Sequence, residues 1–168
     1  MKFNLLDKIE SLSDARIVAT KHVSLAEEYL QDHFPTFPVL PGVMMLEALT
    51  QAAGWLLHHR TNFAKTMSVL KEAKNVKYGN FVAPGRSLKV DCQVVKANSA
   101  GGSFKVSATV EDRSALSGRI ELAYFTLGEK HASLAYLDEK VMAQTKGRWE
   151  VLLQGSDITA EQPTLSLK

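Results

Sequence analysis

The chain has 168 residues, of which 45% are hydrophobic and 23% are charged, and its formal net charge is +2. This length can bury the core of one domain, and the composition is not that of a disordered chain. The small net charge argues against a nucleic-acid-binding protein. The single cysteine, Cys92, allows no intrachain disulfide and gives no zinc-site spacing, so we expect no metal site and a reducing compartment.

The first part of the chain predicts one strand and one short helix. Residues 15–23 are rich in β-branched side chains, which favours a strand. Ser24 and Glu27 have the spacing of a capping box, which predicts a helix over residues 25–30.

A loop stiffened by prolines then leads into the longest apolar run. Pro35, Pro38 and Pro41 exclude regular structure over residues 33–40. Pro41 suits the first turn of a helix that runs to about residue 60, because its missing N–H would have no partner there. This helix is apolar on nearly every face, which is typical of a central, buried helix.

The apolar run over residues 39–57 is about as long as a membrane span. Glu47, Thr50 and Gln51 lie in its middle, however, so a buried helix is the better interpretation. Residues 1–8 carry charge too early for the apolar region of a signal peptide. We therefore expect a cytoplasmic protein without a membrane span.

The rest of the chain to about residue 127 predicts strands, because apolar and polar residues alternate with period two. The expected strands are 68–70, 74–82, 88–94, 104–110 and 120–127, with turns at 98–102 and 112–118. Short turns between consecutive strands predict an antiparallel meander. One buried helix and such a sheet predict an α+β fold in which a curved sheet wraps around the helix.

The C-terminal part of the chain has a different composition. Residues 138–168 mix a few large apolar side chains with glycine, proline and many polar residues. We predict a division into a main domain, residues 1–137, and a C-terminal extension, residues 138–168. The extension is expected to contain a short helix or strand and a loose tail.

Two titratable residues stand where folding alone would not put them. His33 lies in the proline-rich loop, and Glu47 lies inside the apolar helix. An imidazole can accept a proton near neutral pH, and apolar surroundings favour the protonated form of a carboxyl group. A base and an acid held by rigid elements fit proton-transfer chemistry on an apolar substrate.

The segment that contains both residues resembles a known family. His33-Phe-Pro-x-x-Pro-Val-x-Pro-Gly42-Val, then Leu-Glu47-Ala and Gln51-Ala, is similar to the 3-hydroxyacyl-(acyl-carrier-protein) dehydratases of type II fatty acid synthesis, of the FabZ type in the FabA/FabZ-like family. The separation of histidine and glutamate, 47 − 33 = 14 residues, matches that family. A glutamate at position 47 favours the FabZ type over the FabA type. The resemblance covers roughly residues 3–127.

The resemblance implies a hot-dog fold and a homodimer, or a trimer of dimers, with active sites at the subunit interface. It implies that His33 and Glu47 of one site come from different subunits. The reaction implied is loss of water from a 3-hydroxyacyl thioester, giving the trans-2-enoyl thioester. No cofactor is implied, because the substrate is carried on the phosphopantetheine of acyl carrier protein, which is the implied partner.

In this reaction His33 would be the base at C2 and Glu47 the acid at the C3 hydroxyl. The main-chain N–H of Gly42, at a helix N-terminus, would stabilise the thioester oxygen. Gln51, one turn after Glu47, is placed to hold the carboxylate. The residues expected to support the site or line the substrate tunnel are Phe34, Phe37, Pro41, Val43 and Gln51.

Several features leave other interpretations open. Thr36-Phe37 departs from the family pattern, which has glycine and then a basic or polar residue, and the C-terminal part is longer than is usual in the family. The alternatives are a hot-dog protein that acts on acyl-coenzyme A, as a hydratase or thioesterase, and a non-catalytic acyl-binding protein. Cys92 is expected to be inert core. Four histidines show no partner in the sequence and are expected to be structural or solvent-facing: His22, His58, His59 and His131.

Basic residues recur after the predicted central helix. They are Lys71, Lys74, Lys77, Arg86 and Lys89. A basic patch would attract an acidic carrier protein, although an ordinary solvated strand face would have the same composition.

Overall fold

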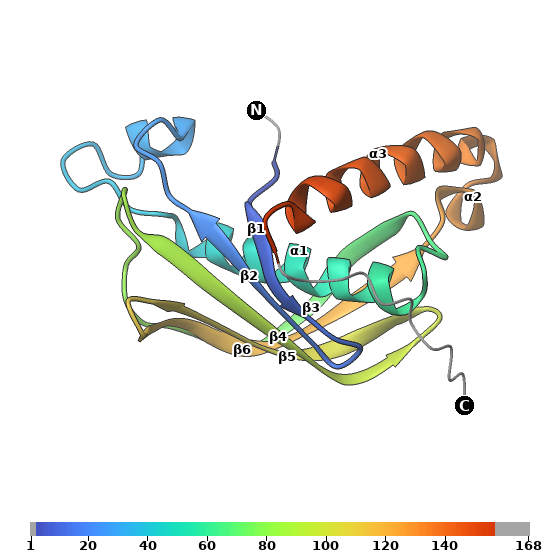
Figure 1. Cartoon of the computed structure of the whole chain (residues 1–168), viewed down its shortest axis with the longest axis horizontal. Coiled ribbons are helices and arrows are strands. Elements are labelled where there is room, and N and C mark those ends of the chain that lie inside the picture. The colour runs from blue at the N-terminus through green and yellow to red at the C-terminus, as the bar shows by residue number, and fades with distance from the viewer. Residues whose placement is uncertain (1–2, 157–168) are drawn as a thin grey trace.

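The computed structural model describes residues 3–156, in which a six-stranded antiparallel sheet curves around one long helix (Figure 1). The elements are β1 (Lys8–Leu12), β2 (Arg16–His22), η1 (Glu28–Gln31), α1 (Gly42–Arg60), β3 (Met67–Tyr78), β4 (Ser87–Asn98), β5 (Gly101–Val110), β6 (Arg113–Phe125), α2 (Leu127–Lys130), η2 (Ala132–Leu134) and α3 (Tyr136–Leu153). The strand order across the sheet is β1-β2-β4-β5-β6-β3. The predicted α+β architecture is confirmed.

Helix α1 forms the centre of the core, and alternate side chains of the central strands point at it. Val90 of β4, Val106 of β5 and Ile120 of β6 are all at most 2% exposed. Cys92 is also buried, and its Sγ donates a hydrogen bond to the Leu49 carbonyl at 3.4 Å. Burial raises the pKa of this thiol, so the prediction that Cys92 is inert core is confirmed.

The sheet differs from the predicted meander in its third strand. Residues 67–78 form one strand, β3, instead of two, because bulges between Leu70 and Glu72 and between Lys74 and Lys77 absorb the irregular stretch. β3 pairs with β6 at the far edge and not with β4, so only β4, β5 and β6 follow one another as a meander.

The predicted turn over residues 112–118 is also wrong. Glu111 and Asp112 have positive φ angles of 49° and 62°, which suits a two-residue hairpin turn. β6 therefore begins at Arg113 and runs through most of the segment that was expected to be a turn. Strand β1 was not predicted at all.

The short helix expected over residues 25–30 is replaced by the four-residue 3₁₀ helix η1. The capping box does not form, because Glu27 pairs with the buried ammonium of Lys21 instead. Ser24 Oγ accepts a hydrogen bond from the N–H of Ala26, so it caps a turn and not a helix.

The C-terminal part of the chain contains an 18-residue helix, α3, which lies on the side of α1 that faces away from the sheet (Figure 1). Trp149 packs against Trp55 of α1 with ring centroids 5.7 Å apart, and Leu152 is fully buried. The boundary predicted at residues 137/138 falls inside α3, and the division into two domains stays a prediction. The expected loose tail lies largely at residues 157–168, outside the described residues.

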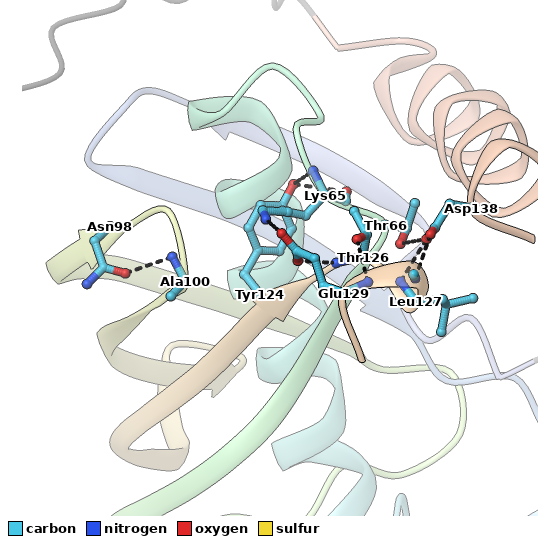
Figure 2. A network of polar contacts seen from close by, with 10 residues as sticks. Lys65, Thr66, Asn98, Ala100, Tyr124, Thr126, Leu127, Glu129 and Asp138 are labelled. Carbon is cyan, nitrogen blue, oxygen red and sulfur yellow. Dashed lines mark hydrogen bonds and ion pairs between the residues drawn. The ribbon is translucent and has the colours of Figure 1, made fainter. Parts of the chain in front are cut away.

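The start of α3 is joined to α2 and to the loop before β3 through one carboxylate (Figure 2). Asp138 accepts hydrogen bonds from the N–H groups of Leu127 and Gly128, at 2.8 and 2.9 Å, and from the hydroxyl of Thr66. These donors, Thr66 first, hold the pKa of Asp138 below its usual value. Within residues 3–156, no helix is both long and apolar enough to cross a bilayer.

One histidine expected to lack a partner lies in a buried polar network at the end of α1. The ring of His58 is enclosed by aromatic side chains, and its Nδ1 lies 3.0 Å from Tyr124 Oη. Tyr124 Oη also contacts Thr61 Oγ1 at 3.0 Å. Burial lowers the pKa of His58 from 6.5 to about 4.

Replacement of Leu152 should show that α3 belongs to the core. Leu152→Ala empties a fully buried site, so we expect it to lower the free energy of unfolding in urea by about 2–5 kcal/mol. The neighbouring Val151, which is 45% exposed, provides the control. Val151→Ala should change the free energy of unfolding by less than about 0.5 kcal/mol. Equal, small effects would contradict the packing of α3.

His58 should make the stability of the protein depend on pH. Because its pKa is lower in the folded chain, the unfolded chain binds more protons below pH 6.5, and stability falls as the pH falls from 6.5 towards 4. When the pH is lowered from 7 to 5, the free energy of unfolding in urea should fall by about 2 kcal/mol more for wild type than for His58→Gln. The exposed His131, changed to Gln, serves as the control, and identical pH slopes for wild type and His58→Gln would contradict the assignment.

Candidate active site

The loop that carries His33 holds its side chain through main-chain hydrogen bonds. The N–H of His33 donates to the Tyr29 carbonyl at 3.1 Å, and the N–H of Val39 donates to the His33 carbonyl at 3.2 Å. The ring Nδ1 lies 3.2 Å from the Val39 carbonyl, which can only accept a hydrogen bond. A neutral ring therefore has its proton on Nδ1 and a free lone pair on Nε2, which is the form that a general base requires.

The side chains next to His33 leave apolar surface exposed. Phe34 stacks on the His33 ring with centroids 4.3 Å apart, and Phe37 meets Phe81 edge to face at 5.7 Å. All three phenylalanines are more than half exposed. Phe34 and Phe37, which were predicted to line a tunnel, thus lie in the same exposed apolar patch as His33. Phe81 also belongs to this patch, and the sequence did not predict its place there.

Pro41 and Gly42 begin helix α1, as the sequence predicts. The Pro41 carbonyl accepts from the N–H groups of Met44 and Met45, whereas those of Gly42 and Val43 have no acceptor within residues 3–156. These free donors point out of the positive end of the helix dipole. Val43 is 71% exposed on the surface beside them.

Tyr78, the last residue of β3, lies directly against Gly42. A Cβ at position 42 would stand 2.8 Å from Tyr78 Cε1, which is too close for the ring in its present position. The sequence gives no signal for this contact, because it joins two segments 36 residues apart (78 − 42 = 36) whose pairing depends on the curvature of the sheet.

Glu47 is half-buried on α1, and its carboxylate is held as predicted. Gln51 Nε2 donates to Glu47 Oε1 at 2.9 Å. The same amide donates to the Phe3 carbonyl at 2.9 Å and accepts from the N–H of Leu5 at 3.0 Å. The side chain of Gln51 therefore ties the carboxylate to the N-terminal segment.

No hydrogen bond or ion pair joins His33 to Glu47 in the part of the chain that the structure describes. The loop before α1 that carries His33 projects at one end of the molecule (Figure 1). Glu47 lies on α1, and its carboxylate is held by Gln51, which also bonds to the N-terminal segment. Two hollows on the sheet, of about 490 and 190 Å³, contain neither residue. One copy of the chain thus holds the His33 ring and the Glu47 carboxylate by separate hydrogen bonds, with none between them.

The five basic residues that follow α1 in the sequence do not form one continuous patch. Lys71, Lys74 and Lys77 lie on the edge strand β3, Arg86 directly precedes β4, and Lys89 lies in β4. Strands β5 and β6 lie between β3 and β4. Four of the five side chains pair with carboxylates, in the pairs Lys71–Glu121, Lys74–Glu72, Arg86–Glu111 and Lys89–Glu10. No group of three metal-ligating side chains occurs among residues 3–156.

Comparison with known proteins assigns the chain to a family. The model of the FabA-like domain matches residues 1–119. The chain belongs to the FabA-like family. The matched segment of this FabA-like chain includes every predicted site residue and ends before α2 and α3.

Individual relatives agree with this assignment. The 3-hydroxyacyl-(acyl-carrier-protein) dehydratase FabZ of Clostridium perfringens strain SM101 is 35% identical over 121 residues, which cover 72% of this chain and 87% of that protein. FabZ of Lactiplantibacillus plantarum is 39% identical over 111 residues, covering 66% and 76%. Among solved structures, the dehydratase heterocomplex ApeI:P of Xenorhabdus doucetiae has a TM-score of 0.61 at 18% identity, covering 73% of this chain and 83% of that one. The structural likeness supports the hot-dog fold of this FabA-like protein.

Proposed function

We propose that this FabA-like protein is a 3-hydroxyacyl-(acyl-carrier-protein) dehydratase. The observation that carries the proposal is the pair of titratable side chains held in place, with the His33 ring oriented by the Val39 carbonyl and the Glu47 carboxyl group oriented by Gln51. The relatives named FabZ, at 35% and 39% identity, support the same reaction and the same carrier. The enzyme would need no metal and no cofactor, because the phosphopantetheine of the carrier protein brings the substrate.

In the proposed reaction each of these groups has one role. His33 Nε2 removes a proton from C2 of the 3-hydroxyacyl thioester, and the electron pair of the C2–H bond forms the double bond to C3. Protonated Glu47 gives its proton to the C3 hydroxyl, which leaves as water. The N–H of Gly42 binds the thioester oxygen while negative charge grows there. The reverse steps hydrate the enoyl thioester.

A dimer would bring the two groups together. β3 is a 12-residue edge strand whose second hydrogen-bonding side meets no other strand of the described sheet. An edge this long pairs readily with a second copy around a two-fold axis. Such pairing would cover Val69, which is 42% exposed, and Tyr78, which is 53% exposed and lies against Gly42 at the start of α1. His33 of one copy would then serve Glu47 of the other, in a homodimer or a trimer of such dimers.

The compartment and the partner belong to the same proposal. Buried, unpaired Cys92 fits a reducing compartment, and we place the enzyme in the cytoplasm. Because the basic residues do not form one patch, docking of the acidic carrier would depend on single charges near the site and on the phosphopantetheine arm.

The reaction can be followed directly by the absorbance of the enoyl thioester formed from a 3-hydroxyacyl-carrier-protein substrate. His33→Ala and Glu47→Gln should each lower the rate by about 10³-fold, because each removes one proton-transfer group. His131→Ala and Glu139→Gln, at exposed positions beyond the site, should keep the wild-type rate.

Four outcomes would count against the proposal. Wild-type activity that survives both substitutions would exclude this mechanism. Release of a free thiol without water loss would indicate a thioesterase, and activity on the coenzyme A ester alone would indicate a hydratase of acyl-coenzyme A. No activity on any thioester would leave a non-catalytic acyl-binding protein.

A further inference from the structure

Helix α3 lies outside the segment that the family model matches, yet it reaches the residues that hold Glu47. Arg148 of α3 donates a hydrogen bond from Nη2 to the Leu6 carbonyl at 2.6 Å, between residues 142 positions apart. Leu6 itself is 1% exposed, so this bond fixes a buried point of the N-terminal segment. Hydrogen bonds from a guanidinium to an oxygen are stronger than those between neutral groups.

The fixed segment in turn holds the side chain that orients the acid. The N–H of Leu5, next to Leu6, donates to Gln51 Oε1 at 3.0 Å, and the Phe3 carbonyl accepts from Gln51 Nε2 at 2.9 Å. These two contacts determine the plane of the Gln51 amide, and its Nε2 donates to Glu47 Oε1 at 2.9 Å. A continuous chain of contacts therefore runs from Arg148 to the carboxylate.

The backbone that follows Arg148 is itself held by packing. The next residue, Trp149, packs against Trp55 and stacks on His59, and Leu152 one turn later is fully buried. Trp55 lies one turn after Gln51 on the same face of α1. α3 and the N-terminal segment therefore cover adjacent parts of one surface of α1.

We propose that Arg148 is a positioning residue for the acid of the dehydratase reaction and that α3 is part of the working enzyme. The proposal rests on the function proposed above. The acid must point its proton at the C3 hydroxyl, and a misplacement of about 1 Å can cost as much as 100-fold in rate. Without the Arg148 bond, the segment of residues 3–6 loosens, the Gln51 amide loses its fixed plane, and the Glu47 carboxyl samples unproductive orientations.

The first test separates positioning from simple stabilisation. Arg148→Met keeps the apolar stem and removes every donor, and we expect kcat to fall about tenfold while KM changes less than about twofold. Arg148→Lys, which can still donate, should recover most of the loss. Lys140→Met, the same change at an exposed position of α3, should have no effect. A kcat for Arg148→Met equal to that of wild type would overturn the proposal.

A double-mutant cycle tests the route through Gln51. Gln51→Leu should lower kcat at least as much as Arg148→Met, and the double variant should be no worse than Gln51→Leu alone, because both changes break one chain of contacts. Losses that multiply in the double variant would show that Arg148 acts by another route and would overturn the proposal.

A second measurement needs no turnover, so it still decides if wild type proves inactive and the proposed function fails. Hydrogen exchange of the Leu5 amide reports its bond to Gln51, and nuclear magnetic resonance of the Gln51 side-chain amide reports its order. Arg148→Met should speed exchange at Leu5 and collapse the two Gln51 amide resonances towards free-amide positions, and Lys140→Met should do neither. Unchanged exchange and resonances in Arg148→Met would overturn the positioning role whatever the activity.

Discussion

The structure depends on one constraint, which is that helix α1 must be covered on every side although it carries a carboxylate. Eleven of its residues are buried, and the sheet can enclose only the faces that point towards it. The N-terminal segment and α3 cover the remaining face, through Gln51, Trp55 and Trp149. Burial of an ionisable group is costly without hydrogen bonds, so the cover over this face must be polar where Glu47 lies. Gln51 supplies that polar contact.

The same arrangement is compatible with the proposed site built from two subunits. His33 is held within its own loop, and Glu47 is held by Gln51, which bonds in turn to the N-terminal segment, so each side chain has a separate support. A loop and a helix that need not touch within one chain can meet across a two-fold axis without rearrangement. The apolar surface left exposed around His33 and along β3 is what such a contact would bury.

Much of the fold could be predicted because its signals are local. Period-two alternation located three strands, the apolar run located α1, and the spacing from Glu47 to Gln51 predicted their hydrogen bond. Contacts between distant segments were missed, since no local pattern reports them: the bulged course of β3, Tyr78 against Gly42, and Arg148 on Leu6. The capping box at Ser24 failed for the same reason, because buried Lys21 attracts Glu27 more strongly than a helix end does.

The central claim, that one site takes its base from one subunit and its acid from another, is tested most directly by mixing two inactive variants. In a random mixture of His33→Ala and Glu47→Gln subunits, half of the dimers contain one of each, and half of the sites in those dimers have both intact groups. Unfolding and refolding the two variants together should therefore restore about a quarter of the wild-type dehydratase activity. A mixture that stays as inactive as either variant alone, although mixed dimers have formed, would contradict the account.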